Sequence, residues 1–217
     1  MQISNLKVAY QDKTIFDGFS YTFEGGITAV LGDSGIGKTT LLNAIAGIVP
    51  YSGDIIDKGV VSYTFQEPRL IDTASVLDNL VFVRGGKVTP TLVEEINKLL
   101  DIVGLKGEIH APVSTLSGGM QSRIALVRAF LYPSDTLLLD EPFKSLDLGM
   151  RVKLWANLRD LLAVAPRKVI LVTHDIDEAI ELGDNIVVLD GNPAKVEFTA
   201  KKGDMGIKEK LTDILTR

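Results

Sequence analysis

Apolar and polar positions alternate in short pieces over residues 2–31 of the chain. This alternation predicts antiparallel strands that lead into a buried strand at residues 27–31. After Pro133, short and fully apolar runs return between segments of helical spacing. Strands of this kind are buried on both faces, so the second half of the pattern predicts a parallel sheet that is covered by helices.

The middle of the chain differs from both ends, because strand signals nearly vanish between Pro68 and Tyr132. Helical spacing appears there at residues 76–83, at residues 92–103 and in the run after Gly119. We therefore expect a helical insertion at residues 68–132 within an α/β core, and a single domain over residues 1–217. The core strands are expected at 27–31, 60–65, 136–139, 168–173, 186–189 and, at an edge, 196–199, and the core helices at 40–46, 151–164, 176–182 and 207–215.

Composition narrows the function classes. The chain has 217 residues, of which 46% are hydrophobic and 24% charged, and this suits a folded chain with a sizeable core. It has no cysteine, which excludes disulfides, thiolate metal sites and cysteine nucleophiles. The net charge of −5 argues against a surface that coats nucleic acid. No apolar run approaches the ~18 residues that span a bilayer, so we expect a cytoplasmic chain whose membrane component would be another polypeptide.

The segment Gly32–Thr39 reads Gly-Asp-Ser-Gly-Ile-Gly-Lys-Thr, which fits the pattern of a loop that cradles phosphate groups. It lies between a predicted strand and a predicted helix, so the phosphates would sit at the positive N-terminus of that helix. In this pattern Lys38 reaches the β- and γ-phosphates, and the Thr39 hydroxyl binds Mg²⁺. The alternative is a chance match in a glycine-rich turn. The nucleotide-binding residues expected here are Gly32, Asp33, Ser34, Gly35, Ile36, Gly37, Lys38, Thr39 and Thr40.

The apolar run at residues 136–139 ends in two acidic residues, Asp140 and Glu141. Ligands of parallel sheets gather at the carboxyl ends of the strands, so Asp140 is expected beside the phosphate loop. A carboxylate there can hold Mg²⁺ opposite Thr39, and Glu141 can polarise a water for attack on a γ-phosphate. The alternative is an acidic turn after a buried strand.

A second glycine-rich segment, Leu-Ser-Gly-Gly-Met at residues 116–120, precedes a helix expected at residues 121–131. Ser117, Gly118 and Gly119 ahead of that helix make a second N-terminus that can bind an anion. An ordinary serine-capped helix start is the alternative. The two anion-binding segments could fold onto one nucleotide within a chain, or two chains could each donate one.

Together and in this order, these motifs resemble those of the nucleotide-binding subunit of ATP-binding-cassette (ABC) transporters, over nearly the whole chain. The family's signature is Leu-Ser-Gly-Gly-Gln, whereas this chain has Met120 at the last place and Ser122 where many members have Gln. Its phosphate loop has Asp33 where the family commonly has Pro, and Ile36 where it has a small residue. Met120 and the Asp-Glu-Pro-Phe form of residues 140–143 resemble the corresponding motifs in importers of the nitrate, sulfonate and taurine type.

The resemblance implies roles for further residues. Tyr10 would stack on adenine, unless it is only a tyrosine at the end of a strand. Gln66 would link the γ-phosphate and the metal to the helical insertion, and His174 would contact the γ-phosphate and position Glu141. Residues 145–147 resemble the loop that crosses to a partner's phosphate site. The implied catalytic residues are Glu141, His174 and Gln66, the metal ligands Thr39, Gln66 and Asp140, and the signature contacts Ser117, Gly118 and Gly119.

The resemblance also implies a fold, cofactors and partners. The fold would be a P-loop NTPase core with a mixed, largely parallel sheet, an N-terminal antiparallel β subdomain and an inserted α-helical subdomain. ATP and Mg²⁺ would bind between two head-to-tail ATPase subunits, most simply two copies of this chain. Transmembrane permease subunits, docked at residues 69–79, would hold the pair at the inner face of the membrane, and an importer could add a substrate-binding protein; no nucleic acid is expected. The alternatives are a non-transport ABC ATPase, an exporter or lipid-extraction ATPase, and a binding module without catalysis.

Overall fold

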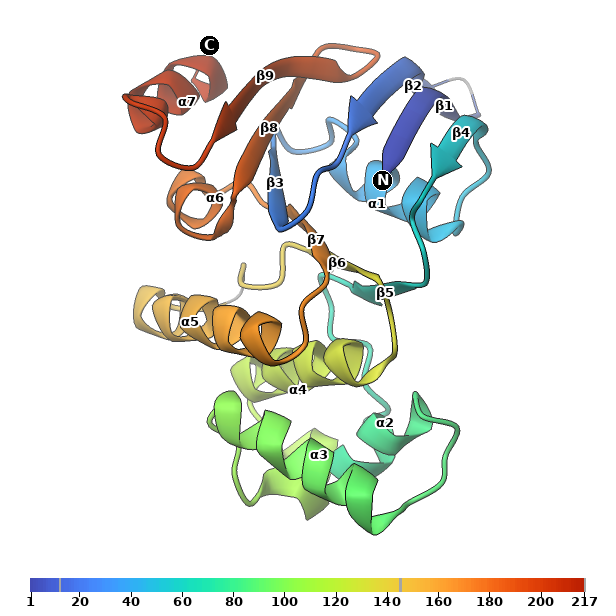
Figure 1. Cartoon of the computed structure of the whole chain (residues 1–217), viewed down its shortest axis with the longest axis vertical. Coiled ribbons are helices and arrows are strands. Elements are labelled where there is room, and N and C mark those ends of the chain that lie inside the picture. The colour runs from blue at the N-terminus through green and yellow to red at the C-terminus, as the bar shows by residue number, and fades with distance from the viewer. Residues whose placement is uncertain (12, 145, 217) are drawn as a thin grey trace.

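The computed structural model describes residues 1–11, 13–144 and 146–216, whose strands form two sheets (Figure 1). The larger sheet has the strand order β5-β6-β7-β3-β8-β9, and the smaller has the order β2-β1-β4. The strands are β1 (Gln2–Tyr10), β2 (Lys13–Thr22), β3 (Ile27–Leu31), β4 (Ser52–Ile56), β5 (Val61–Thr64), β6 (Thr136–Asp140), β7 (Lys168–Val172), β8 (Asn185–Asp190) and β9 (Lys195–Lys201). The helices are α1 (Lys38–Ala46), α2 (Val76–Phe82), α3 (Pro90–Ile102), α4 (Gly118–Leu131), α5 (Leu148–Val164), α6 (Ile176–Leu182) and α7 (Ile207–Leu215).

The larger sheet is parallel from β5 to β8, and β9 joins its edge as an antiparallel strand. Successive residues of β6 face opposite layers. Leu137 and Leu139 pack into a core with the helices of the insertion and α5, whereas Leu138 packs with α1 and the smaller sheet. Because both faces are covered, β3 and β6 are buried along their whole length, which explains their continuous apolar runs. The predicted mixed, largely parallel sheet is confirmed.

The smaller sheet packs beside α1 and is antiparallel throughout, with β1 between β2 and β4. On β1, Ile3, Leu6 and Val8 are buried, while most residues between them remain exposed. This is the alternation seen in the sequence, and the predicted antiparallel strands are confirmed. Strand β4 was not predicted, since its residues are mostly exposed and lack an apolar periodicity.

The helical insertion lies at the lower end of the molecule in Figure 1, away from the smaller sheet. Ser75 and Asp78 form a capping box at the start of α2. Thr89 caps α3, whose first residue is Pro90, a residue suited to the first turn of a helix. These local signals explain why the helices begin close to where the sequence predicts. The apolar sides of α2, α3 and α4 join the core on one face of the larger sheet.

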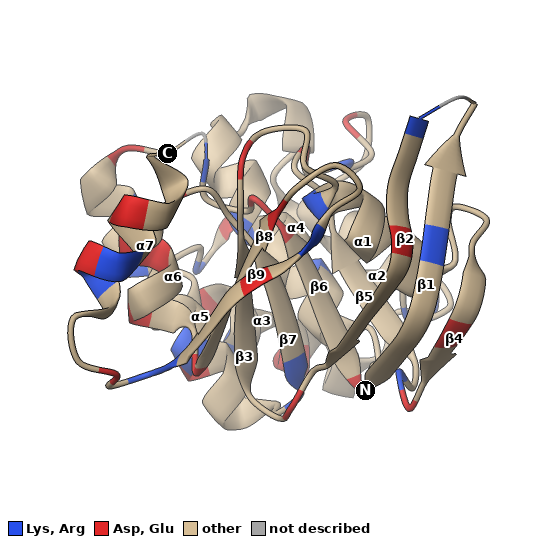
Figure 2. Cartoon of the chain, turned by 90° about the horizontal axis from the view of Figure 1, so that it is seen from above, with Lys and Arg blue, Asp and Glu red and all other residues tan. Residues whose placement is uncertain are grey.

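Charged residues of both signs are interspersed over the molecule. Seen from above, acidic and basic positions neighbour one another on α7 and are dispersed over the strands of both sheets (Figure 2). Among the helices of residues 1–11, 13–144 and 146–216, none combines the length and hydropathy that crossing a bilayer requires.

Candidate functional site

The segment Gly32–Gly37 forms the turn that links the carboxyl end of β3 to α1. Gly37 has a φ of 115°, and a Cβ there would lie 2.5 Å from the Ile15 side chain. Gly32 has a φ of 147°, and a Cβ there would lie 2.6 Å from the Leu189 carbonyl oxygen. Both positions therefore require glycine, for backbone conformation and for space. The loop keeps its backbone N–H groups at the start of α1, as a phosphate cradle needs.

The Lys38 side chain folds back over this loop and is only 5% exposed. Its ammonium donates hydrogen bonds to the Gly32 carbonyl oxygen at 2.6 Å and to the Asp33 carbonyl oxygen at 2.9 Å. Burial lowers the pKa of Lys38, although the nearby carboxylates of Glu141 and Asp140 act in the opposite direction. A buried cation held at the mouth of the loop is suited to a polyanionic ligand.

Thr39 and Asp140 meet beside the loop, where the Thr39 hydroxyl donates to Asp140 Oδ1 at 3.1 Å. The Tyr63 hydroxyl donates to the other oxygen, Oδ2, at 3.2 Å. Burial raises the pKa of Asp140 despite these two hydrogen bonds. Hydroxyl and carboxylate oxygens are the ligands that Mg²⁺ prefers, so the donor set fits this ion, and Gln66 lines the adjoining cavities.

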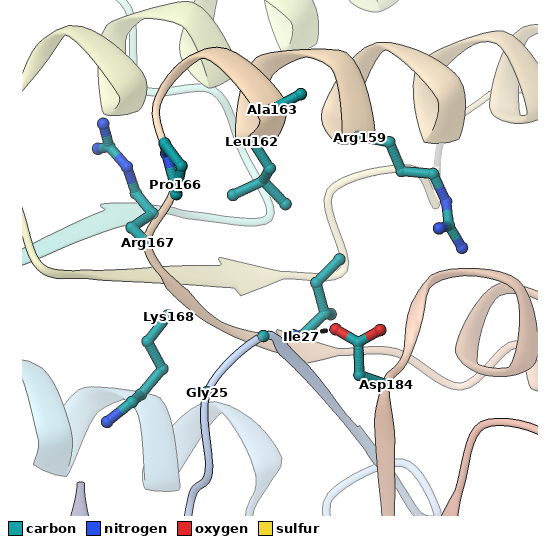
Figure 3. Close-up of a pocket in the computed structure, with 10 residues that line it drawn as sticks. Gly25, Ile27, Arg159, Leu162, Ala163, Pro166, Arg167, Lys168 and Asp184 are labelled. Carbon is teal, nitrogen blue, oxygen red and sulfur yellow. Dashed lines mark hydrogen bonds between the residues drawn. The ribbon is translucent and has the colours of Figure 1, made fainter.

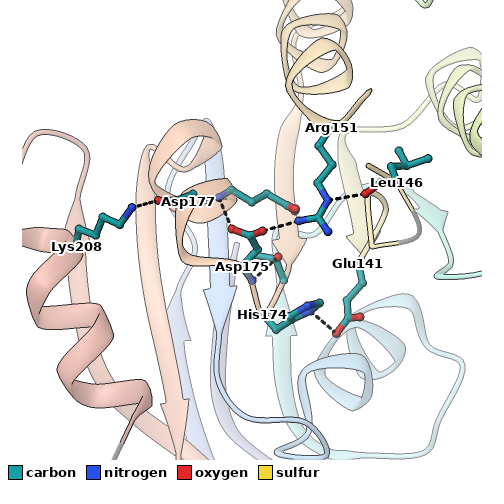
Figure 4. Close-up of polar contacts among 9 residues, drawn as sticks. Glu141, Leu146, Arg151, His174, Asp175, Asp177 and Lys208 are labelled. Carbon is teal, nitrogen blue, oxygen red and sulfur yellow. Dashed lines mark hydrogen bonds and ion pairs between the residues drawn. The ribbon is translucent and has the colours of Figure 1, made fainter. Parts of the chain in front are cut away.

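Glu141, the next residue, has a φ of 46°, a left-handed conformation that is uncommon outside glycine. Its backbone N–H donates to the Val172 carbonyl oxygen at 2.9 Å, which fixes the turn onto β7. Its Oε1 lies 3.5 Å from Nδ1 of His174, as Figure 4 shows, and its Oε2 lies 2.7 Å from Nζ of Lys144. Burial alone would raise the pKa of Glu141, but the ion pair with Lys144, with smaller effects of His174 and Lys38, lowers it.

The segment that carries His174 is tied to the loop after Glu141. Asp175 accepts from the Arg151 guanidinium at 2.6 Å and caps α6 by accepting from the Glu178 N–H at 3.1 Å (Figure 4). Arg151 also donates from Nε to the Leu146 carbonyl oxygen at 3.0 Å. This bridge keeps the histidine near the carboxylate that it faces.

The phosphate loop, the acidic residues and His174 converge because β3, β6 and β7 are neighbours in the sheet and all end at the same edge. A cavity of about 200 Å³ at this edge is lined by Ser34, Gly35, Gly37, Lys38, Thr39, Thr40, Gln66, Glu141 and Lys144. A neighbouring cavity of about 580 Å³ shares Thr39 and Gln66 and adds Asp140 and Tyr63. A third, of about 190 Å³, is lined by Asp33 and Ile36 among others.

The described residues that line these three cavities do not include the segment Ser117–Gly119. Ser117 instead caps α4, and its Oγ accepts from the Met120 N–H at 3.3 Å. Tyr10 lies at the end of β1, is 43% exposed and does not line these cavities either. Of the loop at residues 145–147, Ser145 lies outside the described residues, and Asp147 caps α5.

A further cavity, of about 650 Å³, lies at the opposite, amino ends of β3 and β7 (Figure 3). Its polar side chains are largely engaged within the chain. Arg167 donates to backbone carbonyls, among them that of Phe130 at 3.2 Å, and Asp184 accepts from the Ile27 N–H at 2.8 Å. We therefore place the candidate site at the carboxyl edge of the sheet, where the phosphate loop, the two acidic residues and His174 converge.

Sequence reasoning missed two contacts in this site, those of Tyr63 and Lys144. Tyr63 pairs with Leu138 in the parallel register of β5 and β6, so its ring projects on the same face as Asp140, two residues further along β6. Lys144 lies three residues after Glu141, close enough for a turn to bring the side chains together. The second spacing was visible in the sequence, whereas the first depended on the strand register.

The fold and this site together define an ATP-binding protein of the P-loop class. The sequence model described as ABC transporter matches residues 17–144. Aliphatic sulfonates import ATP-binding protein SsuB 2 of Burkholderia cenocepacia is 39% identical over 201 residues, which cover 87% of this chain and 73% of that protein. Taurine import ATP-binding protein TauB of Roseobacter denitrificans is 35% identical over 206 residues, which cover 88% of this chain and 76% of that protein.

Solved structures show the same fold. A dimeric bacterial ABC transporter cassette superposes with a TM-score of 0.79 at 23% identity, covering 92% of this chain and 97% of that one. The cbiO1 protein of Clostridium perfringens, part of an ABC transporter complex, gives a TM-score of 0.82 at 23% identity, covering 99% and 91%. The chain therefore belongs to the ABC transporter family and is an ATP-binding subunit, as the resemblance implied.

Proposed function

We propose that this chain is the ATP-hydrolysing subunit of an ABC importer and works as a pair of copies on a membrane permease. The observation that carries the proposal is the placement of Glu141 between His174 and Lys144, beside the cavity of the phosphate loop. Import is supported by the relatives that are named as import proteins for aliphatic sulfonates and for taurine. The pair would sit at the inner face of the membrane through the permease, with residues 69–79 as the docking surface.

The chain's own groups would divide the work of hydrolysis. The loop N–H groups and Lys38 would bind the phosphates, and Tyr10 would stack on the adenine. Glu141 would accept a proton from water while the water oxygen attacks the γ-phosphorus and the bond to the bridging oxygen breaks, leaving ADP and phosphate. His174, which faces Glu141, would orient that water.

Thr39, Asp140 and Gln66 would hold Mg²⁺, which neutralises charge on the phosphate oxygens when bound. Tyr63 has a supporting part in this arrangement, because its hydroxyl orients the Asp140 carboxylate. Tyr63→Phe keeps the ring and removes only this hydroxyl. We expect it to raise the Mg²⁺ concentration for half-maximal phosphate release by about tenfold.

A matched control for this measurement is Tyr21→Phe on β2, whose hydroxyl donates to no other residue within 1–11, 13–144 and 146–216. It should leave the Mg²⁺ dependence unchanged. Direct Mn²⁺ titration by electron paramagnetic resonance with bound ADP gives a second readout. Wild-type Mn²⁺ affinity in Tyr63→Phe would refute the supporting role of this hydroxyl.

The position of Ser117–Gly119, outside the cavities of its own chain's phosphate loop, supports a composite site. In a head-to-tail pair, the start of α4 in one copy would face the triphosphate held by the other, and neither copy would be complete alone. ATP would then join the two copies, and loss of its γ-phosphate would release them.

Complementation between two inactive variants tests the composite site. Lys38→Ala removes the ammonium that would bind the phosphates, and Ser117→Arg blocks the start of α4. Each variant should be inactive as a homodimer. Co-expressed in equal amounts, about half of the pairs should be mixed and hold one complete site of two, so about a quarter of wild-type phosphate release should return. If both variants fold and the mixture still releases no phosphate, this result would contradict the composite site.

A further inference from the structure

The phosphate-loop cavity holds a second cation, Lys144, which none of the sequence motifs covers. The ammonium of Lys144 lies 2.7 Å from Oε2 of Glu141 and lines the same cavity as Lys38 and Thr39. Its side chain is 47% exposed, whereas that of Glu141 is 14% exposed. Lys144 is thus the accessible partner of the pair, and it lines the cavity together with the phosphate loop's own lysine.

The backbone holds Lys144 in this place. The turn begins at Glu141, and the Lys144 N–H donates to the Glu141 carbonyl oxygen at 3.3 Å. Between them Phe143 is 2% exposed and anchors the turn in the core. The position of the Lys144 Cα therefore follows from the end of β6, and only its flexible stem remains to be ordered when a ligand arrives.

Lys144 can offset the repulsion between the Glu141 carboxylate and a γ-phosphate in the cavity. A carboxylate that serves as a base must approach the γ-phosphate, and the two anions repel each other. An ammonium has three donors and no acceptor, so it can keep its contact with Glu141 and donate to a phosphate oxygen at the same time. Lys38, by contrast, is buried and already donates to two carbonyl oxygens of the loop.

We propose that Lys144 is a second phosphate-binding residue, which bridges Glu141 and the γ-phosphate of bound ATP. The inference rests on the proposed function and adds a residue to it. ADP lacks the γ-phosphate, so Lys144 should distinguish ATP from ADP, whereas Lys38 and the loop N–H groups should bind both.

The test compares the affinities of ATP and ADP by calorimetry in buffer with EDTA, which stops hydrolysis and removes the metal from the measurement. Lys144→Met keeps the length of the side chain without its charge. We expect it to weaken ATP binding about tenfold and ADP binding less than about twofold. Lys144→Arg restores the cation and should return ATP affinity to within about threefold of wild type.

The matched control is Lys98→Met on α3, which breaks a lysine–glutamate pair of 2.9 Å with Glu94 far from the cavity. It should change neither affinity. Unchanged ATP affinity in a folded Lys144→Met protein would overturn the proposal. Tighter ATP binding would overturn it as well, because Lys144 would then occupy the cavity only without nucleotide and compete with ATP. Failure of the proposed function would show itself differently, as unchanged nucleotide binding in Lys38→Ala.

Discussion

Replacing Glu141 with glutamine is expected to slow ATP hydrolysis by about 10²- to 10⁴-fold, the range that a general base contributes. The substitution keeps the shape of the side chain and removes only its ability to take a proton. ATP binding should persist, because the loop and Lys38 are untouched. A pair of copies that binds ATP without cleaving it should then accumulate as a dimer, visible by size-exclusion chromatography with light scattering.

The matched control is Glu95→Gln, an equally conservative change at an exposed carboxylate that pairs with Arg84 at 3.4 Å in the helical insertion. Its phosphate release should equal that of the wild type. Full ATPase activity in Glu141→Gln would remove this residue from the catalytic role. A monomer in the presence of Mg-ATP, with turnover blocked, would contradict the sandwiched nucleotide instead.

The parts of this site that the sequence predicted are those in which one short segment carries both structure and chemistry. The phosphate loop is such a segment, since the turn leaves no room for a side chain at positions 32 and 37 and only glycine fits there. The acidic end of β6 is another, because an apolar run followed by two carboxylates fixes both the strand and the end at which the acids emerge. Ser117 was likewise readable as a helix cap.

Contacts between segments were harder to foresee, because they depend on strand order and register. The hydrogen bond from Tyr63 to Asp140 exists because β5 and β6 are neighbours and pair in one particular register. No local pattern in residues 60–65 predicts that Tyr63 contacts Asp140. Strand β4 escaped prediction for a related reason: it is held by its pairing with β1, and its own residues are too exposed to leave a pattern.

The second large effect is expected at Lys38. Its truncation to alanine should weaken ATP binding by at least about 100-fold, because removing one member of a buried charge pair commonly costs that much affinity. The physical reason lies in the nucleotide-free state. Burial lowers the pKa of Lys38, and the carboxylates of Glu141, Asp33 and Asp140 offset this effect only in part, so a further anion beside the ammonium would be favourable. A phosphate group would supply that anion, and the alanine variant has no group left to receive it.

Thermal unfolding provides a measurement that separates this effect from damage to the fold. The melting temperature without nucleotide should fall by no more than about 10 °C, because the variant stays folded while the Gly32 and Asp33 carbonyl oxygens lose their donor. The rise in melting temperature on adding ATP should vanish, since ligand stabilisation depends on the ratio of concentration to Kd. Lys58→Ala is the control, as it also removes an ammonium that donates to a backbone carbonyl oxygen, in this case that of Ile45 in α1 at 3.1 Å. An undiminished ATP-induced shift in Lys38→Ala would place the triphosphate somewhere other than this loop.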